Sequence, residues 1–222
     1  MNSLLRSTIA VLFAVPLLLA TGCANPNAAD SANFAGAITK YLQQRGNGHI
    51  CYSASYSFPV AIYRDSNSYY LNTGSSDMFP TALSSTTLSH LHQLVAAGLV
   101  ASSRTRFTVS NFFQSSTYPE TKYILTDAGK RLIYPGNSSN NAALCFANTT
   151  VAKIVNFTIP GQVNGVTASE VTWSAGAVPI SAIEPYFKAG KLVFLKRLAS
   201  AQIASNRTGT AILTHLGWVY DN

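Results

Sequence analysis

The sequence predicts an α+β protein in two parts, an N-terminal half that contains helices and a smaller C-terminal half that is rich in sheet. Apolar residues recur at helical spacing in two segments of the first half, 33–45 and 86–97. After a stretch of turn-forming residues, 135–143, runs rich in β-branched residues dominate. We therefore expect a domain over 33–134, a linker over 135–143, and a sheet-rich domain over 144–222.

The first segment predicts an amphipathic helix. Asn33 is a suitable N-cap and Gly46 a suitable stop. Its apolar face is formed by Phe34, Ile38, Tyr41 and Leu42. The following residues, 49–70, are rich in Tyr, Ser, Val and Ile but contain Pro59, which indicates strand or irregular extended structure. A polar stretch, 72–77, separates them from the next element.

The second segment predicts the clearest helix of the chain, with a Ser/Thr cluster before it and Gly98 as its stop. Its apolar residues are Leu88, Leu91, Leu94 and Val95. Residues 99–113 then alternate in part, and 122–126 follow a loop centred on Pro119. This pattern predicts a β-hairpin.

The C-terminal half reads as strands with one short helix. We expect strands over 144–159, 163–175 and 208–220, and a short helix over 180–187. The segment Ile124 to Gly129 also recurs in form as Ile212 to Gly217, with four identities in six residues. A repeated strand-to-turn device and coincidence are both compatible with so short an echo.

Residues 88–100, the hairpin after them and residues 123–129 together resemble the third helix and wing of winged-helix domains. The resemblance covers about residues 34–134. It implies that a Thr-x-x-Gly turn starts a final helix such as 130–134. It also implies that Ser89, His90 and Gln93 would enter a DNA major groove, and that Arg104 and Arg106 of the wing would contact phosphates.

The N-terminus carries the pattern of a secretory signal in residues 1–22. Arg6 precedes an apolar run of about a dozen residues, which is shorter than the roughly 20 residues of a spanning helix. The sequence Leu19-Ala20-Thr21-Gly22-Cys23 resembles the lipobox of bacterial lipoproteins, although Ala20 stands where leucine is usual. The resemblance implies cleavage before Cys23 and lipidation, including a palmitate, on that cysteine. A simple signal cut nearby is the alternative.

Residues 23–32 are small and polar, and we expect a flexible tether there. No acidic residue directly follows Cys23, which in the resembled family favours the outer membrane, with the protein facing the periplasm. In that oxidising compartment, Cys51 and Cys145 are expected to form a disulfide, the alternative being two buried free thiols. The formal charge of +7 at pH 7 becomes +6 if Arg6 leaves with the signal.

The sequence contains no recognisable catalytic or metal-binding motif. There is no Gly-x-Ser-x-Gly, His-Glu-x-x-His or phosphate-binding glycine loop, and the few carboxylates are scattered. His90 and His92 are two residues apart on a helix and would point to different faces. We therefore expect no catalytic residue, no metal site and no cofactor. Aromatic residues concentrate at Tyr52, Tyr56, Phe58, Tyr63, Tyr69 and Tyr70, a pattern typical of a binding surface or of packing against a sheet.

These observations favour an exported, lipid-anchored envelope protein of a non-catalytic, binding or structural type. Its expected partners are the membrane, through the lipid, and an envelope protein or the cell wall; the expected compartment excludes nucleic acid. The alternatives are a periplasmic enzyme without a recognisable motif and a DNA-binding winged-helix regulator. Through Leu144-Cys145-Phe146 and Val155-Asn156-Phe157-Thr158 the chain also resembles a group of proteobacterial envelope lipoproteins, a resemblance that brings no activity with it.

Overall fold

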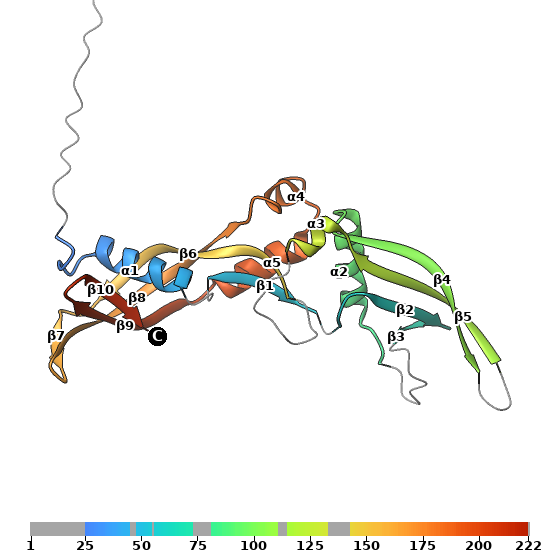
Figure 1. Cartoon of the computed structure of the whole chain (residues 1–222), viewed down its shortest axis with the longest axis horizontal. Helices are drawn as coiled ribbons and strands as arrows, with labels where there is room; N and C mark the ends of the chain where they lie inside the picture. Colours follow the sequence, from blue (N-terminus) through green and yellow to red (C-terminus); the bar gives the residue numbers. More distant parts are fainter. Residues whose placement is uncertain are drawn as a thin grey trace, which may run out of the picture.

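The structure is a computed structural model that describes residues 25–44, 48–54, 56–72, 81–110, 115–132 and 143–221. The described strands form two antiparallel sheets, one of six strands and one of four, and helices lie against both (Figure 1). The mixed, sheet-rich α+β character predicted from the sequence is therefore confirmed. None of the helices within the described ranges is long and apolar enough to cross a membrane.

The larger sheet has the order β1-β6-β8-β9-β10, with β7 paired to β8 at the side. Its strands are β1 (His49–Ser53), β6 (Ala143–Phe157), β7 (Gly161–Val163), β8 (Val166–Pro179), β9 (Asn206–Thr214) and β10 (Gly217–Asp221). The runs expected to be strands in the C-terminal half are strands. The region expected over 208–220 is a hairpin, in which Gly217 adopts a positive φ of 102°.

Helix α1 (Ser31–Gln44) packs on this larger sheet, at the end of the molecule shown on the left of Figure 1. Phe34 is fully buried, and its ring centroid lies 4.9 Å from those of Phe157 and Trp218. Strand β1 also joins this sheet, by pairing with β6. Elements from the segment 33–134 therefore contribute to both sheets, because an apolar helix face specifies burial but not which sheet buries it.

The smaller sheet has the order β3-β2-β5-β4 and projects from the other end of the molecule (Figure 1). Its strands are β2 (Val60–Asp65), β3 (Ser68–Asn72), β4 (Val100–Ser110) and β5 (Ser115–Leu125). Helix α2 (Ser85–Ala96) precedes β4, and the short α3 (Asp127–Lys130) follows β5. The predicted helix and hairpin are both present. Of the final helix implied over 130–134, the structure describes residues only as far as 132.

Helix α2 begins and ends as its sequence indicates. The side chain of Ser84 accepts a hydrogen bond from the backbone N–H of Thr87, and Gly98 follows the helix with a φ of 71°. Leu91 and Leu94 are fully buried in the core beneath the smaller sheet. Ser84 and Gly98 thus set where the helix begins and ends, and the apolar stripe between them decides which face is buried.

Two helices between β8 and β9 connect the parts of the molecule. Helix α4 (Glu184–Lys188) lies in the expected 180–187 region, whereas α5 (Val193–Gln202) is absent from the sequence prediction. Phe194 and Leu195 of α5 share one core cluster with Leu91 of α2 and Ile50 of β1. This cluster joins the projecting sheet to the rest of the protein.

The predicted disulfide is present. Cys51 of β1 and Cys145 of β6 face each other in the strand register, with their Cα atoms 3.9 Å apart. Cys23, the predicted lipidation site, lies outside the described residues, as do the signal residues 1–22. The described residues of the expected flexible tether that precede α1, 25–30, make turns, and Trp218 Nε1 donates a 3.0 Å hydrogen bond to the carbonyl oxygen of Ala28.

Candidate functional site

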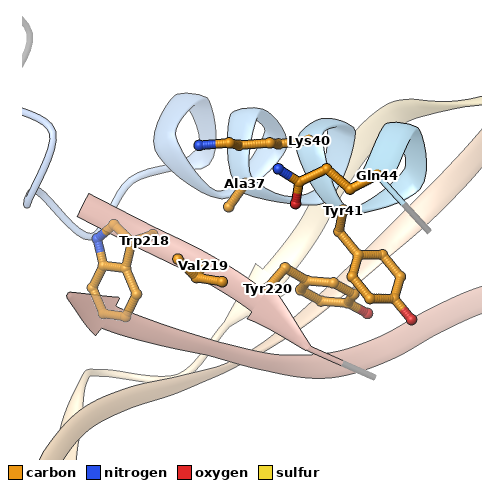
Figure 2. A pocket seen from close by; sticks show the side chains of 7 residues that line it. All are labelled: Ala37, Lys40, Tyr41, Gln44, Trp218, Val219 and Tyr220. Carbon is orange, nitrogen blue, oxygen red and sulfur yellow. The ribbon is translucent and has the colours of Figure 1, made fainter. Parts of the chain in front are cut away.

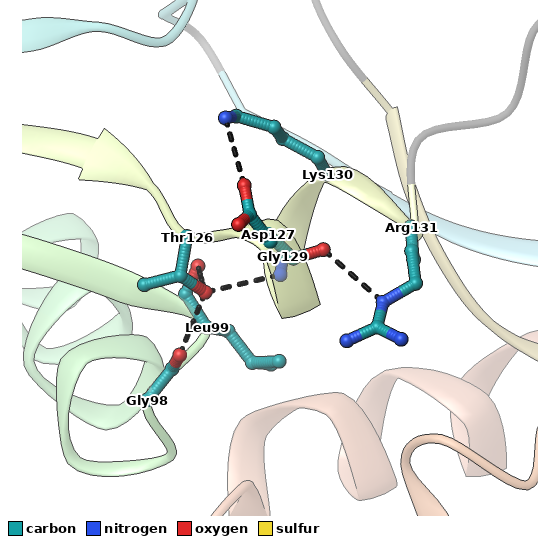
Figure 3. Close-up of polar contacts among 7 residues, drawn as sticks. All are labelled: Gly98, Leu99, Thr126, Asp127, Gly129, Lys130 and Arg131. Atoms are coloured by element: carbon teal, nitrogen blue, oxygen red, sulfur yellow. Dashed lines mark hydrogen bonds and ion pairs between the residues drawn. The ribbon is translucent and has the colours of Figure 1, made fainter.

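A small polar network lies where α2, β4 and α3 meet (Figure 3). The hydroxyl of Thr126 accepts a 3.2 Å hydrogen bond from the N–H of Gly129 and donates a 2.7 Å bond to the carbonyl of Gly98. The Thr126 N–H donates to the carbonyl of Leu99 at 3.0 Å. A Cβ on Gly129 would lie 2.1 Å from that same carbonyl oxygen. Only glycine permits this close approach, which holds the hairpin against the end of α2.

One face of the projecting sheet carries four aromatic rings, which we call the aromatic cluster. Tyr63 lies opposite Tyr70 in the register, and Phe107 lies opposite Tyr118. The ring centroid of Tyr63 is 5.5 Å from that of Tyr70, 5.3 Å from that of Phe107 and 5.5 Å from that of Tyr118. All four side chains are partly exposed. Burial, followed by the neighbouring Tyr118 and Tyr70, raises the pKa of the Tyr63 hydroxyl above its ordinary value.

A buried carboxylate lies on the same face as the aromatic cluster. Glu120 is opposite Tyr63 and Thr105 in the register and is only 4% exposed. The side-chain amide of Asn72 donates a hydrogen bond to it. Because neighbouring residues of a strand point to opposite faces, Pro119 and Thr121 are directed to the other face, towards α2.

The other face forms a cleft of about 400 Å³ between the sheet and α2. Three arginines, Arg64, Arg104 and Arg106, line it together with His92 of α2. The remaining lining residues are Ile62, Tyr69, Leu88, Thr105, Pro119, Glu120, Thr121 and Tyr123. We call this the arginine cleft. Arg104 and Arg106, which the winged-helix resemblance assigns to phosphate contacts, therefore lie on the face of the hairpin that is directed towards α2.

The helix side chains that the winged-helix resemblance assigns to a DNA groove are partly engaged inside the protein. The ring of His90 stacks on that of Phe194 of α5, with centroids 4.1 Å apart, and Tyr52 lies edge-on at 5.6 Å. Gln93 Oε1 accepts a 3.3 Å hydrogen bond from the backbone N–H of Phe194. Ser89 is exposed. Burial lowers the pKa of His90 below its ordinary value.

The aromatic stretch found in the sequence is divided between packing and surface. Tyr52, Tyr56 and Phe58 belong to or pack against the core, and burial raises the pKa of the Tyr56 hydroxyl far above its ordinary value. Tyr63 and Tyr70 belong to the aromatic cluster. Packing thus accounts for part of the stretch, and Tyr63 and Tyr70 remain partly exposed. Sequence reasoning missed Phe107 and Tyr118, which come from the other hairpin.

A second hollow lies between α1 and β10 (Figure 2). It has a volume of about 510 Å³ and is lined by Ala37, Lys40, Tyr41, Gln44, Trp218, Val219 and Tyr220. The rings of Tyr41 and Tyr220 meet edge to face at 5.3 Å, and Tyr220 and Trp218 are buried. These aromatic side chains are used in packing α1 against the sheet, so the hollow is a seam between two elements.

Residues with metal-binding side chains are dispersed. Among the residues that the structure describes, no three His, Cys, Asp or Glu side chains are placed to hold one metal ion. His49 Nδ1 lies 2.9 Å from the side-chain oxygen of Asn148, across the β1–β6 pair. Comparison of the chain with protein-family models, with curated proteins and with solved structures finds no match.

Proposed function

We propose that this chain is an exported, lipid-anchored envelope protein that is non-catalytic and binds another envelope component through the aromatic cluster. The observation that carries the proposal is the gathering of four partly exposed aromatic rings on one face of a projecting sheet. Aromatic side chains are enriched in protein interfaces and contribute a large share of their binding free energy. Burying these rings against a partner would remove apolar area from water at the tip of the molecule.

The geometry of the N-terminus supports this arrangement. Cys23 precedes Asn25, the first described residue, by two positions. The hydrogen bond from Trp218 Nε1 to the carbonyl oxygen of Ala28 holds the start of the described chain beside β10. Figure 1 shows β10 and the projecting sheet at opposite ends of the molecule. A lipid on Cys23 would therefore leave the aromatic cluster directed away from the membrane surface.

We further propose that α2, β4, β5 and α3 reuse a winged-helix-like scaffold for a role other than reading DNA. The order of helix, hairpin and capped turn agrees with the resemblance. The stacking of His90 on Phe194 and the hydrogen bond to Gln93 engage side chains that a DNA-reading helix leaves free for base edges. A fold can serve unrelated functions, so the resemblance by itself assigns none.

Site-specific photo-crosslinking in intact cells tests the binding surface. A benzoylphenylalanine at position 107 is expected to form an adduct with an envelope protein or with cell-wall material. The matched control is the same residue at Val163, which is 55% exposed on β7, at the end of the molecule away from the cluster. The proposal would be contradicted if the probe at position 107 formed no adduct, or if the probes at positions 107 and 163 formed adducts in equal amounts. Tyr63→Ser is expected to reduce the position-107 adduct.

Lipid anchorage is tested separately. In cells fed a palmitate analogue, the wild-type protein is expected to incorporate the label and sediment with membranes. Cys23→Ser is expected to lose the label, whereas Cys51→Ser in β1 keeps it. Recovery of a protein that retains Met1 and an unmodified Cys23 would refute the anchorage, whatever the crosslinking shows.

A further inference from the structure

The arginines of the arginine cleft are brought together by strand register. Tyr63 is paired with Glu120, so the next residue, Arg64, lies level with Pro119, and Arg106 is paired with Pro119 from the other side. Arg64 and Arg106 thus occupy one row across the sheet, about 10 Å apart at two strand spacings. The residue between them is a proline, whose short ring leaves space above it. Arg104 is two residues along β4 and points to the same face.

The charge on this face is unbalanced. Among the described residues, Arg104 and Arg106 make no ion pair, and both are exposed. Arg64 is oriented by a 3.1 Å hydrogen bond from its Nε to the carbonyl of Ser66, and its guanidinium lies 5.7 Å from the centroid of Tyr69. These contacts leave its terminal nitrogens as donors.

Glu120 is the one carboxylate among the described residues that line the cleft. The side chain of Glu120 belongs to the opposite face and accepts the hydrogen bond from Asn72. Among the described residues that line this cavity of about 400 Å³, three are arginines, and the single carboxylate, Glu120, belongs to the opposite face of the sheet.

The base of the cleft is apolar. Ile62 and Tyr123 are buried, and Leu88 of α2 is partly buried against the same core. All three line the cavity beside the arginines. A ligand that fills this space must present both an anionic group to the arginines and an apolar group to the base.

We propose that the arginine cleft binds a phosphate ester that carries an apolar chain. Guanidinium groups bind phosphate oxygens through paired, charge-assisted hydrogen bonds, and three of them suit a group with three oxygens and up to two charges better than a single carboxylate. The apolar chain lies against Leu88, Ile62 and Tyr123. This site is on the opposite face from the aromatic cluster and does not depend on the function proposed for that cluster.

Calorimetric titration of the purified protein with hexyl phosphate tests the proposal. Hexyl phosphate is expected to bind at least tenfold more tightly than inorganic phosphate, because only the ester reaches the apolar base. Arg104→Gln combined with Arg106→Gln is expected to weaken binding more than tenfold. Arg106→Lys keeps the charge but loses the planar fork, and should weaken binding by an intermediate factor.

The control variant is Arg197→Gln in α5, which removes one exposed charge elsewhere and is expected to change the dissociation constant less than twofold. Absence of saturable hexyl phosphate binding, equal binding of hexanol, or insensitivity to Arg104→Gln with Arg106→Gln would overturn the proposal. So would displacement of hexyl phosphate by a 12-base-pair DNA duplex at equal concentration, which would identify a nucleic-acid site.

A last arm distinguishes the source of the ligand. Vesicles of phosphatidylcholine with and without phosphatidic acid, whose headgroup is a phosphate monoester, are sedimented with the wild type and with the double arginine variant. Arginine-dependent binding to the phosphatidic acid vesicles supports a lipid headgroup in a membrane. Binding of hexyl phosphate without arginine-dependent binding to the vesicles supports a soluble phosphate ester.

Discussion

Replacing Gly129 by alanine is the sharpest test of how the projecting sheet is held. Gly129 lies in the first turn after β5, where its α-carbon faces the carbonyl group of Leu99 (Figure 3). An added Cβ would lie 2.1 Å from the Leu99 oxygen and 3.0 Å from Leu125 Cδ2. The closer neighbour is backbone, so it cannot rotate away as a flexible side chain would. Either the turn or the start of β4 must move.

The cost follows from what that carbonyl does. It accepts hydrogen bonds from the N–H of Thr126 at 3.0 Å and from the Thr126 hydroxyl at 3.1 Å. Loss of two hydrogen bonds costs about 1 to 3 kcal/mol, and forcing extra volume into a packed site costs about 1 to 3 kcal/mol more. We expect Gly129→Ala to lower the free energy of unfolding by about 2 to 6 kcal/mol. For a chain of this size, a loss of about 4 kcal/mol lowers the Tm by about 8 to 16 °C.

The control is Gly36→Ala in α1, where nothing lies within 4 Å of the added Cβ. An exposed helical alanine is more stable than glycine by about 0.5 to 1 kcal/mol, so this variant is expected to gain stability. Urea unfolding followed by circular dichroism measures both variants. If Gly129→Ala unfolds at the same urea concentration as the wild type, or above it, the close contact does not hold the hairpin and the reasoning is refuted.

Three further predictions concern the disulfide, a partly buried histidine and a buried hydrogen bond. Replacing both Cys51 and Cys145 by alanine is expected to lower the free energy of unfolding by about 4 to 5 kcal/mol, because the bridge closes a loop with a sequence separation of 94; urea midpoints equal to those of the wild type would contradict this. Burial lowers the pKa of His90 in the folded protein, so this histidine binds a proton more readily in the unfolded chain. Its contribution to the free energy of unfolding is therefore complete above about pH 6.5 and is lost as the pH falls below that value. The Tm of the wild type should therefore fall more between pH 7.5 and 5.5 than that of His90→Phe, and parallel profiles would argue against the shift. Tyr220→Phe removes the acceptor of the 3.0 Å hydrogen bond from Trp173 Nε1 and is expected to cost about 1 to 3 kcal/mol in thermal unfolding, whereas an unchanged Tm would show that the indole N–H finds another acceptor.

The short sequence echo shows how far local pattern extends. Thr126 accepts a hydrogen bond from the N–H of Gly129, three residues on, and starts α3. Thr214 accepts from the N–H of Leu216, two residues on, and donates to the carbonyl of Gly217 within the β9–β10 hairpin. In both places the threonine stabilises a turn, but one turn starts a helix and the other a strand. The residues that the two segments share specify a turn, and the packing around each turn specifies its type.

The aromatic cluster and the arginine cleft depend on contacts between distant residues. The tyrosine-rich stretch of the sequence predicts an aromatic surface in general terms, yet Phe107 and Tyr118 reach Tyr63 only because β5 pairs with both β2 and β4. The same pairing places Arg64 in one row with Arg106. Strand register cannot be derived from the residues of any one strand, since it is set by all its neighbours together.

The sequence by itself determined the local features: the apolar period of α1 and α2, the ends of α2, the β4–β5 hairpin, and a pair of cysteines suited to a disulfide. It placed the N-cap of α1 at Asn33, whereas the helix begins at Ser31 and the N–H of Asn33 donates to Asp30 Oδ1. Only the tertiary structure decided that α1 and β1 join the C-terminal sheet, that α5 covers His90, and that the two faces of the small sheet carry rings and arginines. The physical reason is that helix periods, caps and turns depend on residues a few positions apart. The partner of an apolar face is chosen by the burial of the whole chain, to which residues far apart in the sequence contribute equally.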